Sequence, residues 1–192
     1  MNVLAVDIGG TKLTMALFEG SNLVERHRDA TDRAGGRDWM LDRIDAQTQA
    51  WRARHPIDRC GISFGGPVDF AAQTIYRSTH VAGWSGFDLA GWMRERLAIE
   101  AVIDNDANAG ALGEARFGAG RGCDPFFHMT LSTGIGGGIV AGGKLLRGAE
   151  SYAGELGHMT IRPDGPECLC GARGCLERMC GGLWLERDHG RP

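Results

Sequence analysis

Short apolar runs and glycine turns alternate along the first part of the chain. The run at 3–8 ends in two glycines, and alternation of apolar and polar residues over 12–18 and 22–28 is typical of strands. These segments predict an antiparallel meander of three strands. Apolar side chains at spacings of three and four over 37–54 instead predict a helix with one buried stripe, which ends before Pro56.

The middle of the chain carries patterns for four further elements. They are a strand at 59–64, a helix capped by Asp88 that runs through 97, a strand at 101–104 and an alanine-rich helix at 105–117. The first of these strands runs into the glycine turn of Gly65, Gly66 and Pro67. The last helix closes at a glycine, which is a common helix terminator.

A second series of the same kind begins after this helix. Residues 126–132 predict a strand, Gly134–Gly138 a turn, and 139–146 a pair of strands. The order of strand, glycine turn and strand matches the start of the chain. The repetition predicts two lobes, 1–118 and 119–192, that face each other across a cleft.

Composition excludes several classes of partner. The 192 residues hold 21 Lys and Arg against 24 Asp and Glu, a formal charge of −3, so no basic field attracts nucleic acid or anionic lipid. The first residues carry no basic leader, and no apolar run approaches the roughly 20 residues of a membrane span. We expect no nucleic acid and no membrane as partners, and a cytoplasmic location.

Six cysteines in a reducing compartment are more often metal ligands or core residues than disulfides. Cys60 and Cys123 stand alone, and each is predicted to be a small buried apolar residue. The remaining four cluster near the end of the chain.

Three of the clustered cysteines, Cys168, Cys170 and Cys175, have the C-x-C-x₄-C spacing of a compact loop that binds zinc. Tetrahedral zinc needs a fourth ligand, and the spacing alone leaves Cys180 and His158 as equal candidates. Either choice closes the coordination shell, so the zinc is predicted to be structural, because a catalytic zinc keeps an open position for water.

The first glycine turn, DIGGTK at 7–12, has the composition of a phosphate site. Its glycines expose backbone N–H groups, Thr11 and Lys12 add donors, and Asp7 ends a strand where a carboxylate can hold hydrated Mg²⁺. An ordinary hairpin turn is the alternative, because Gly-Gly is common there. The P-loop pattern does not match.

The second glycine turn, STGIGGGI at 132–139, continues as a strand, whereas a dinucleotide fingerprint opens a helix. We therefore set dinucleotide binding aside. Two such turns, one in each predicted lobe, favour a phosphate chain that is held from both sides.

Asn105 and Asp106 lie where a predicted strand meets a predicted helix. The helix dipole keeps a carboxylate there ionised, and it can serve as base toward a bound hydroxyl. Asn and Asp are also the preferred helix caps, and position alone favours that role. A cap at Asn105 and a base at Asp106 satisfy both interpretations.

In this order the motifs resemble the ROK family of repressors, open reading frames and sugar kinases. The matching segments are DIGGTK at 7–12, GGPVD at 65–69, DNDANAGALGE at 104–114, STGIGGGI at 132–139, and ELGH at 155–158 with CLCGARGCLE at 168–177. The resemblance spans nearly the whole chain. It implies an α/β chain with the actin-like, ribonuclease-H-like ATPase fold, in two lobes of which the second is incomplete.

The resemblance also implies an activity, the ATP-dependent phosphorylation of a hexose or N-acylhexosamine. Asp106 would accept the proton of the 6-hydroxyl as it attacks the γ-phosphate. The residues implied to bind the sugar are Gly66, His80, Asn105, Glu155, His158 and Glu177. Those implied to line ATP and Mg²⁺ are Asp7, Gly9, Gly10, Thr11, Lys12, Thr133, Gly134 and Gly136. In the family the histidine of ELGH is also the fourth zinc ligand, which favours His158.

Three departures from the family pattern bear on function. His80, in STHVAGW, stands where a hydroxyl-binding asparagine is expected. FGGPVD at 64–69 replaces the commoner PGPVD, a smaller change that leaves the turn glycine at Gly66, and the chain stops at Pro192 where family members continue. It also begins without the helix-turn-helix domain of the repressors, which argues against DNA binding. The alternatives to a kinase are a truncated, catalytically weak sugar-binding protein and a zinc-stabilised fragment without function. A homodimer is the assembly we consider.

Overall fold

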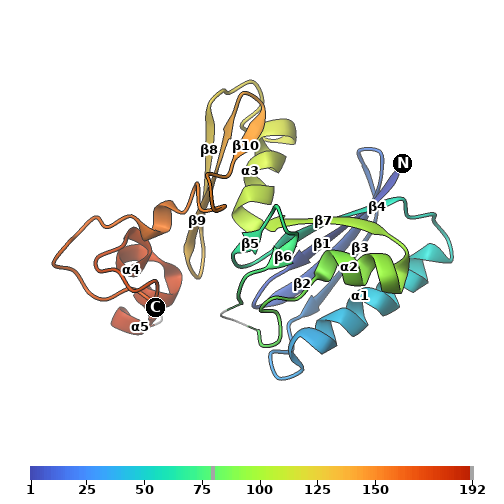
Figure 1. Ribbon diagram of the computed structural model, residues 1–192, viewed down its shortest axis with the longest axis horizontal. Coiled ribbons are helices and arrows are strands. Elements are labelled where there is room, and N and C mark those ends of the chain that lie inside the picture. Colours follow the sequence, from blue (N-terminus) through green and yellow to red (C-terminus); the bar gives the residue numbers. More distant parts are fainter. Residues whose placement is uncertain (79–80, 191–192) are drawn as a thin grey trace. The chain divides into compact units, whose positions relative to one another are not determined.

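The computed structural model describes residues 1–78 and 81–190. The chain divides into two compact units, Met1–Asp106 and Ala107–Pro192, whose elements are labelled in Figure 1. The lobe boundary expected at residue 118 lies at the far end of the helix that starts the second unit. Among the described residues, no helix combines the length and the apolar character that crossing a membrane requires.

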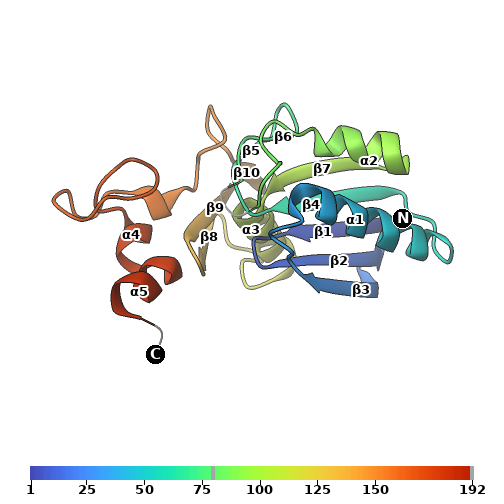
Figure 2. The same cartoon turned by 90° about the horizontal axis from the view of Figure 1, so that it is seen from below.

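The first unit is built on a five-stranded sheet with the order β3-β2-β1-β4-β7 (Figure 2). Its strands are β1 (Asn2–Ile8), β2 (Lys12–Glu19), β3 (Asn22–Ala30), β4 (Arg59–Phe64) and β7 (Glu100–Asn105). The first three strands form the predicted antiparallel meander. In contrast, β1, β4 and β7 run parallel, so that their carboxyl ends meet at one edge of the sheet.

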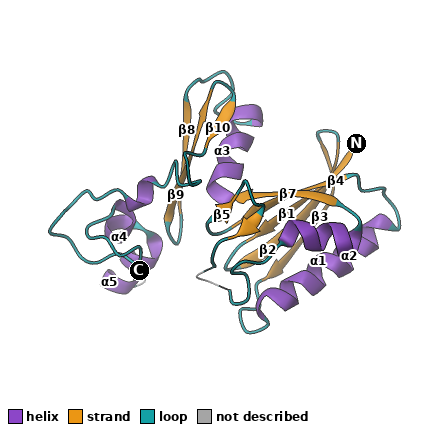
Figure 3. Cartoon of the chain, in the orientation of Figure 1, coloured by secondary structure: helices purple, strands orange, loops and turns teal. Residues whose placement is uncertain are grey.

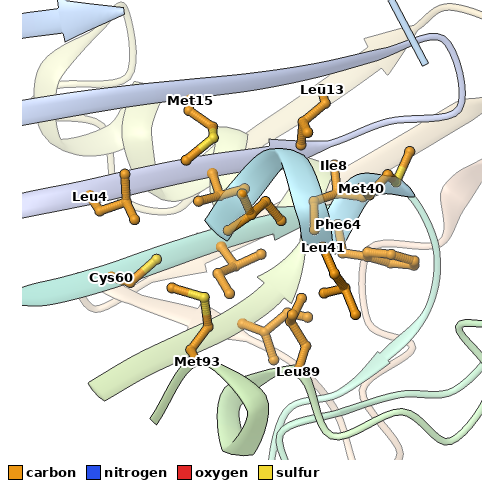
Figure 4. Packing of buried hydrophobic residues seen from close by; sticks show 14 of the residues in the cluster. Leu4, Ile8, Leu13, Met15, Met40, Leu41, Cys60, Phe64, Leu89 and Met93 are labelled. Atoms are coloured by element: carbon orange, nitrogen blue, oxygen red, sulfur yellow. The ribbon is translucent and has the colours of Figure 1, made fainter. Parts of the chain in front are cut away.

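Helices α1 (Gly36–Arg52) and α2 (Leu89–Leu97) cover one face of this sheet (Figure 3). Alternate residues of each central strand point to that face, as Leu4, Val6 and Ile8 of β1 do, and they pack with both helices in one core (Figure 4). As predicted, α2 is capped by Asp88, whose Oδ1 accepts a 2.7 Å hydrogen bond from the Gly91 N–H.

The two isolated cysteines have different surroundings. Cys60 belongs to the core of the first unit, which confirms the prediction, and burial raises the pKa of its thiol to about 12. Cys123 is exposed, so the prediction of burial was wrong there. It lies in a tight turn between α3 and β8, where its N–H donates to the carbonyl of Gly120.

A short hairpin, β5 (Val68–Asp69) and β6 (Thr74–Ile75), was not predicted. Gln73 in its turn fastens it to the edge strand β7. Its Oε1 accepts a 2.8 Å bond from the Ile103 N–H, and its Nε2 donates to the Ile103 carbonyl at 3.3 Å. The Gln73 amide thus forms hydrogen bonds with the N–H and carbonyl of Ile103, backbone groups that would otherwise be unpaired on an edge strand.

Helix α3 (Asp106–Phe117) begins on the last residue of the first unit, and the rest of it lies in the second unit, together with a three-stranded antiparallel sheet of order β10-β9-β8. The strands are β8 (Phe126–Leu131), β9 (Ile135–Ala141) and β10 (Lys144–Leu146). The predicted turn at Gly134–Gly138 was wrong, because β9 already begins at Ile135. Its glycines serve packing instead: a Cβ on Gly138 would lie 2.6 Å from the Ala111 Cβ of α3.

The end of the chain forms a long loop between short helices, none of which was predicted. They are the 3₁₀ helix η1 (Leu156–His158), α4 (Leu176–Cys180) and α5 (Gly182–His189). Isolated bridges pair Thr160 with Cys175 and Glu167 with Arg173, so the loop folds back on itself. We call residues 158–176 the metal loop.

Candidate functional site

Three polar residues form a row across the parallel strands of the first unit. The register pairs Asp7 of β1 with Ser63 of β4, and Ser63 with Asp104 of β7. The Ser63 hydroxyl donates a 2.9 Å hydrogen bond to Oδ1 of Asp7. The row lies near the carboxyl ends of the strands, where open α/β sheets bind their ligands.

The glycine turn after β1 is held from one side by residues that follow β3. The Gly9 carbonyl accepts a 3.0 Å hydrogen bond from Thr31 Oγ1, and the Gly10 carbonyl accepts a 2.9 Å hydrogen bond from Arg33 Nε. The Thr31 N–H donates to the Thr11 carbonyl. In a trans peptide the N–H points opposite to the preceding carbonyl. The N–H groups of Gly10 and Thr11 therefore point away from Thr31 and Arg33, as donors to an anion do.

Asp106 lies beside this turn in the same unit. The Gly65 N–H donates to the Ile8 carbonyl at 2.9 Å, which places Gly65 against the glycine turn. A Cβ on Gly65 would be 3.6 Å from the Cα of Gly9 and 3.7 Å from Oδ2 of Asp106. The carboxylate and the glycine turn thus face the same small residue.

Asn105 ends β7 and is tied to the neighbouring glycine turn. Its Nδ2 donates a 3.1 Å bond to the carbonyl of Gly66, and its N–H donates to Oδ1 of Asp104 at 2.8 Å. Gly66 has no room for a side chain, because a Cβ would lie 2.9 Å from the Arg77 carbonyl. Asn105, Gly66 and Asp106 are therefore parts of one arrangement at the strand ends.

In the second unit, the sharp turn between β8 and β9 consists of Ser132, Thr133 and Gly134. The Ser132 N–H donates to the Gly134 carbonyl at 2.9 Å. Glu177 of α4 contacts the same turn, because its Oε2 accepts a 2.8 Å bond from the Ile135 N–H. Gly136 lies beyond the turn, within β9.

Glu155 and His158 lie at the two ends of η1, and the His158 N–H donates to the Glu155 carbonyl at 3.1 Å. The glycine between them, Gly157, packs directly on the Ile135 carbonyl, where a Cβ would overlap it. Helix η1 contacts both α4 and β9. The ELGH segment and Glu177 are therefore fixed around the start of the same strand.

His158, Cys168, Cys170 and Cys175 come together as a candidate metal centre, with all four ligand atoms within 4.8 Å of one another. Cys170 Sγ lies 3.6 Å from Cys175 Sγ, and Cys168 Sγ lies 3.7 Å from Nδ1 of His158. Two sulfurs bound to one tetrahedral zinc at about 2.3 Å are about 3.8 Å apart. The separations and the donor set fit zinc.

Cys180 does not belong to this group. Its thiol donates a 3.2 Å hydrogen bond to the Leu176 carbonyl within α4. Burial raises the pKa of Cys175 to about 12, and hydrogen bonds and charges of Cys170 and Cys168 add to the shift. Burial therefore disfavours a free thiolate at Cys175, and a zinc ion that replaced the thiol proton would compensate the thiolate charge.

Comparison with known proteins identifies the family. The model of the ROK family matches residues 3–192, nearly all of the chain. The chain belongs to the ROK family.

Two glucokinases are similar to the chain. The glucokinase of Streptomyces coelicolor is 36% identical over 185 residues, which cover 96% of this chain and 57% of the glucokinase. The crystal structure of a ROK glucokinase from Streptomyces griseus, in complex with glucose and AMPPNP, superposes with a TM-score of 0.84 at 36% identity. That match covers 97% of this chain and 59% of the glucokinase. The chain thus carries part of the actin-like ATPase fold of the ROK kinases.

A repressor is also similar to the chain. The xylose repressor of Bacillus subtilis is 33% identical over 179 residues, which cover 91% of this chain and 46% of the repressor. The chain spans about half the length of these curated relatives, 57% of the glucokinase and 46% of the repressor.

The structure places most of the residues that the sequence singled out in two groups. In the first unit, Asp7, the DIGGTK turn, Gly66, Asn105 and Asp106 gather at the strand ends. In the second unit, Thr133, Gly134, Glu155, His158 and Glu177 surround the start of β9. His80 lies outside the described residues.

Several residues that support these groups were not singled out by the sequence. They are Ser63, Thr31 and Arg33 in the first unit, and Ile135 and Gly157 in the second. One signal for Ser63 was available: DIGG and SFGG both place a polar residue two positions before a glycine pair. In parallel strands of equal register, such residues become neighbours.

Proposed function

We propose that this chain carries the catalytic base and the sugar- and phosphate-binding residues of an ATP-dependent sugar kinase that acts on a hexose or N-acylhexosamine. The observation that carries the proposal is the position of Asp106. It lies at the carboxyl end of the parallel strands, against the same glycine that packs on the DIGGTK turn. A base and a phosphate cradle at one sheet edge are what phosphoryl transfer to a hydroxyl requires.

In the proposed reaction Asp106 accepts the proton of a sugar hydroxyl, the 6-hydroxyl. The hydroxyl oxygen forms a bond to the γ-phosphorus while the bond from that phosphorus to the β,γ-bridging oxygen breaks, and ADP leaves. Asn105, tied to the Gly66 carbonyl, orients the sugar beside the base. A Mg²⁺ ion, when bound with ATP, neutralises phosphate charge and would be held through Asp7.

The remaining roles divide between the two units. The residues assigned to the phosphates are Asp7, Gly9, Gly10, Thr11 and Lys12 in the first unit and Thr133, Gly134 and Gly136 in the second. Glu155, His158 and Glu177 bind ring hydroxyls of the sugar. Since Nδ1 of His158 faces Cys168, Nε2 is the ring nitrogen assigned to the sugar.

The structural zinc is assigned to His158, Cys168, Cys170 and Cys175. A zinc ion bound there would hold the ends of the metal loop together and fix the orientation of the His158 ring. The sugar ligands would then be oriented before the substrate arrives, which lowers the entropic cost of reaching the reactive geometry. A homodimer, a cytoplasmic location and a lobe boundary near residue 118 stay predictions.

The test is a coupled assay of ADP release over a panel of hexoses and N-acylhexosamines, with the natural chain and Asp106→Asn. We expect release with at least one sugar, and a loss of about 100-fold or more in kcat for the variant, the usual range for a removed general base. Equal rates for the two proteins would remove Asp106 as the base. Calorimetric binding of a sugar without ADP release would favour the non-catalytic sugar-binding alternative.

A further inference from the structure

The backbone of Ile135 is held from both sides by segments next to the metal loop. Its N–H donates to Oε2 of Glu177, two residues after the ligand Cys175. Its carbonyl is in contact with Gly157, the residue before the ligand His158, where a Cβ would overlap the oxygen. Both peptide groups around Ile135 are therefore fixed by residues that stand one or two positions from candidate metal ligands.

The turn before Ile135 is fastened to the junction between α4 and α5. The N–H groups of Gly182 and Leu183 donate to the carbonyls of Ser132 and Thr133 at 2.8 and 2.9 Å. A Cβ on Gly182 would lie 2.5 Å from the Ser132 carbonyl oxygen. The turn fits against α5 only when position 182 has no side chain.

Gly134 completes this set of contacts. A Cβ at this position would overlap Oε2 of Glu177, so the glycine leaves the space that the carboxylate fills. The other oxygen, Oε1, accepts no hydrogen bond from the described residues. One carboxylate thus has one oxygen committed to the turn and one oxygen available to a ligand.

From these contacts we propose that the metal loop sets the shape of the second glycine turn, and that Glu177 is the positioning residue that transmits it. Oε2 fixes the turn at Ile135, and Oε1 faces the sugar. Glu177 would then couple sugar binding to the geometry of the turn assigned to the phosphates. The catalytic meaning of this coupling rests on the proposed function, whereas the positioning of the turn does not.

The positioning is tested by hydrogen–deuterium exchange of the zinc-loaded chain, read at residues 132–138. We compare the natural chain with Glu177→Ala, which removes the acceptor, and Glu177→Gln, whose side-chain carbonyl can still accept the Ile135 N–H. We expect exchange of the Ile135 amide to accelerate about tenfold or more in Glu177→Ala and to stay within about twofold of the natural chain in Glu177→Gln. Glu150→Ala, a change of an exposed glutamate in the same unit, is the matched control.

A second variant keeps the test independent of the Glu177 side chain. Gly182→Ala forces the Ser132 carbonyl away from α5 and should accelerate exchange at 132–135 with the carboxylate intact. Gly113→Ala, where a Cβ would meet nothing within 4 Å, is its control. Unchanged protection of the turn in both Glu177→Ala and Gly182→Ala would overturn the proposal.

The proposal also predicts that the two Glu177 variants change the KM values for the sugar and for MgATP differently. Glu177→Gln should raise KM for the sugar and leave KM for MgATP within about twofold, whereas Glu177→Ala should raise both. A rise of the sugar KM alone in Glu177→Ala would contradict the coupling. If the natural chain phosphorylates no sugar, the proposed function fails, and the exchange result still decides whether Glu177 positions the turn.

Discussion

Ser63 donates a 2.9 Å hydrogen bond to Oδ1 of Asp7 from the neighbouring parallel strand, in direct register. The bond restricts the rotamer of the Asp7 carboxylate near the end of β1. It also leaves Oδ2 as the oxygen assigned to hydrated Mg²⁺. Ser63 is thus expected to orient Asp7 without contacting a substrate.

Ser63→Ala should therefore weaken MgATP binding more than it weakens the fold. We expect KM for MgATP to rise about tenfold, as for partners that orient a metal ligand. The unfolding free energy should fall by about 1 kcal/mol, the net worth of one hydrogen bond. Steady-state kinetics at varied MgATP and urea unfolding measure the two effects. Ser63→Thr keeps the hydroxyl and is the control; equal MgATP constants for Ser63→Ala and the natural chain would contradict the orienting role.

Two glycines near each other on and after β4 should respond differently to alanine. A Cβ on Gly66 would lie 2.9 Å from the Arg77 carbonyl, whereas a Cβ on Gly61 would meet nothing within 4 Å. We expect Gly66→Ala to lower the unfolding free energy by about 1–3 kcal/mol through overpacking. Gly61→Ala should leave it unchanged or raise it by about 0.5 kcal/mol, because alanine loses less backbone entropy on folding.

Urea unfolding of the two variants and the natural chain checks this expectation. The slope of free energy against urea concentration should be the same in all three, so that a shift in midpoint reports stability alone. Equal midpoints for Gly66→Ala and Gly61→Ala would show that the backbone around Arg77 moves aside without cost.

The sequence was sufficient where the signals are local. Alternation of apolar residues identified the strands of the first sheet, and the side chain of Asp88 marked the start of α2 as it caps that helix in the structure. The sequence also predicted that Asp7, Asn105 and Asp106 lie at strand ends. Each of them stands where an apolar strand pattern gives way to a glycine turn or to a helix pattern. These features depend on neighbours within a few residues along the chain.

Where function depends on contacts between distant segments, the sequence was insufficient. The glycines of β9 indicated a turn, yet they make room for α3, for example at Gly138 against Ala111. The bond from Ile135 to Glu177 joins residues 42 positions apart, and no pattern in either segment predicts it. The hairpin of β5 and β6 was missed for the same reason. The side chain of Gln73 makes the hydrogen bonds to the Ile103 backbone that a neighbouring strand would otherwise make.

Metal analysis should separate His158 from Cys180 as the fourth zinc ligand. We expect one zinc per chain, lost from Cys175→Ser and from His158→Ala and retained by Cys180→Ser, whose thiol is bonded to the Leu176 carbonyl. Zinc affinity of the first two variants should fall at least about 100-fold, since removing a ligand costs more than removing its supporting partner. Elemental analysis and competition with a chromogenic chelator provide the measurement.

The same variants test what the metal does for the fold. Zinc binding contributes to folding free energy, so chelation should lower the melting temperature of the natural chain and of Cys180→Ser, but not of Cys175→Ser. Loss of zinc from Cys180→Ser with retention by His158→Ala would mean a site of four sulfurs.

Stability at alkaline pH should report the burial of Cys60. Its thiol has a pKa of about 12 in the folded chain against an ordinary value of 9.0, so above pH 9 the unfolded chain binds fewer protons than the folded one. The contribution of Cys60 to the unfolding free energy is therefore fully present below pH 9 and is lost as the pH rises toward 12, at up to about 1.4 kcal/mol per pH unit. Urea unfolding from pH 8 to 10.5 should show this decline in the natural chain and in Cys123→Ala, which removes an exposed thiol, and a smaller decline in Cys60→Ala. Equal slopes in the natural chain and Cys60→Ala would mean that the Cys60 thiolate is solvated without unfolding.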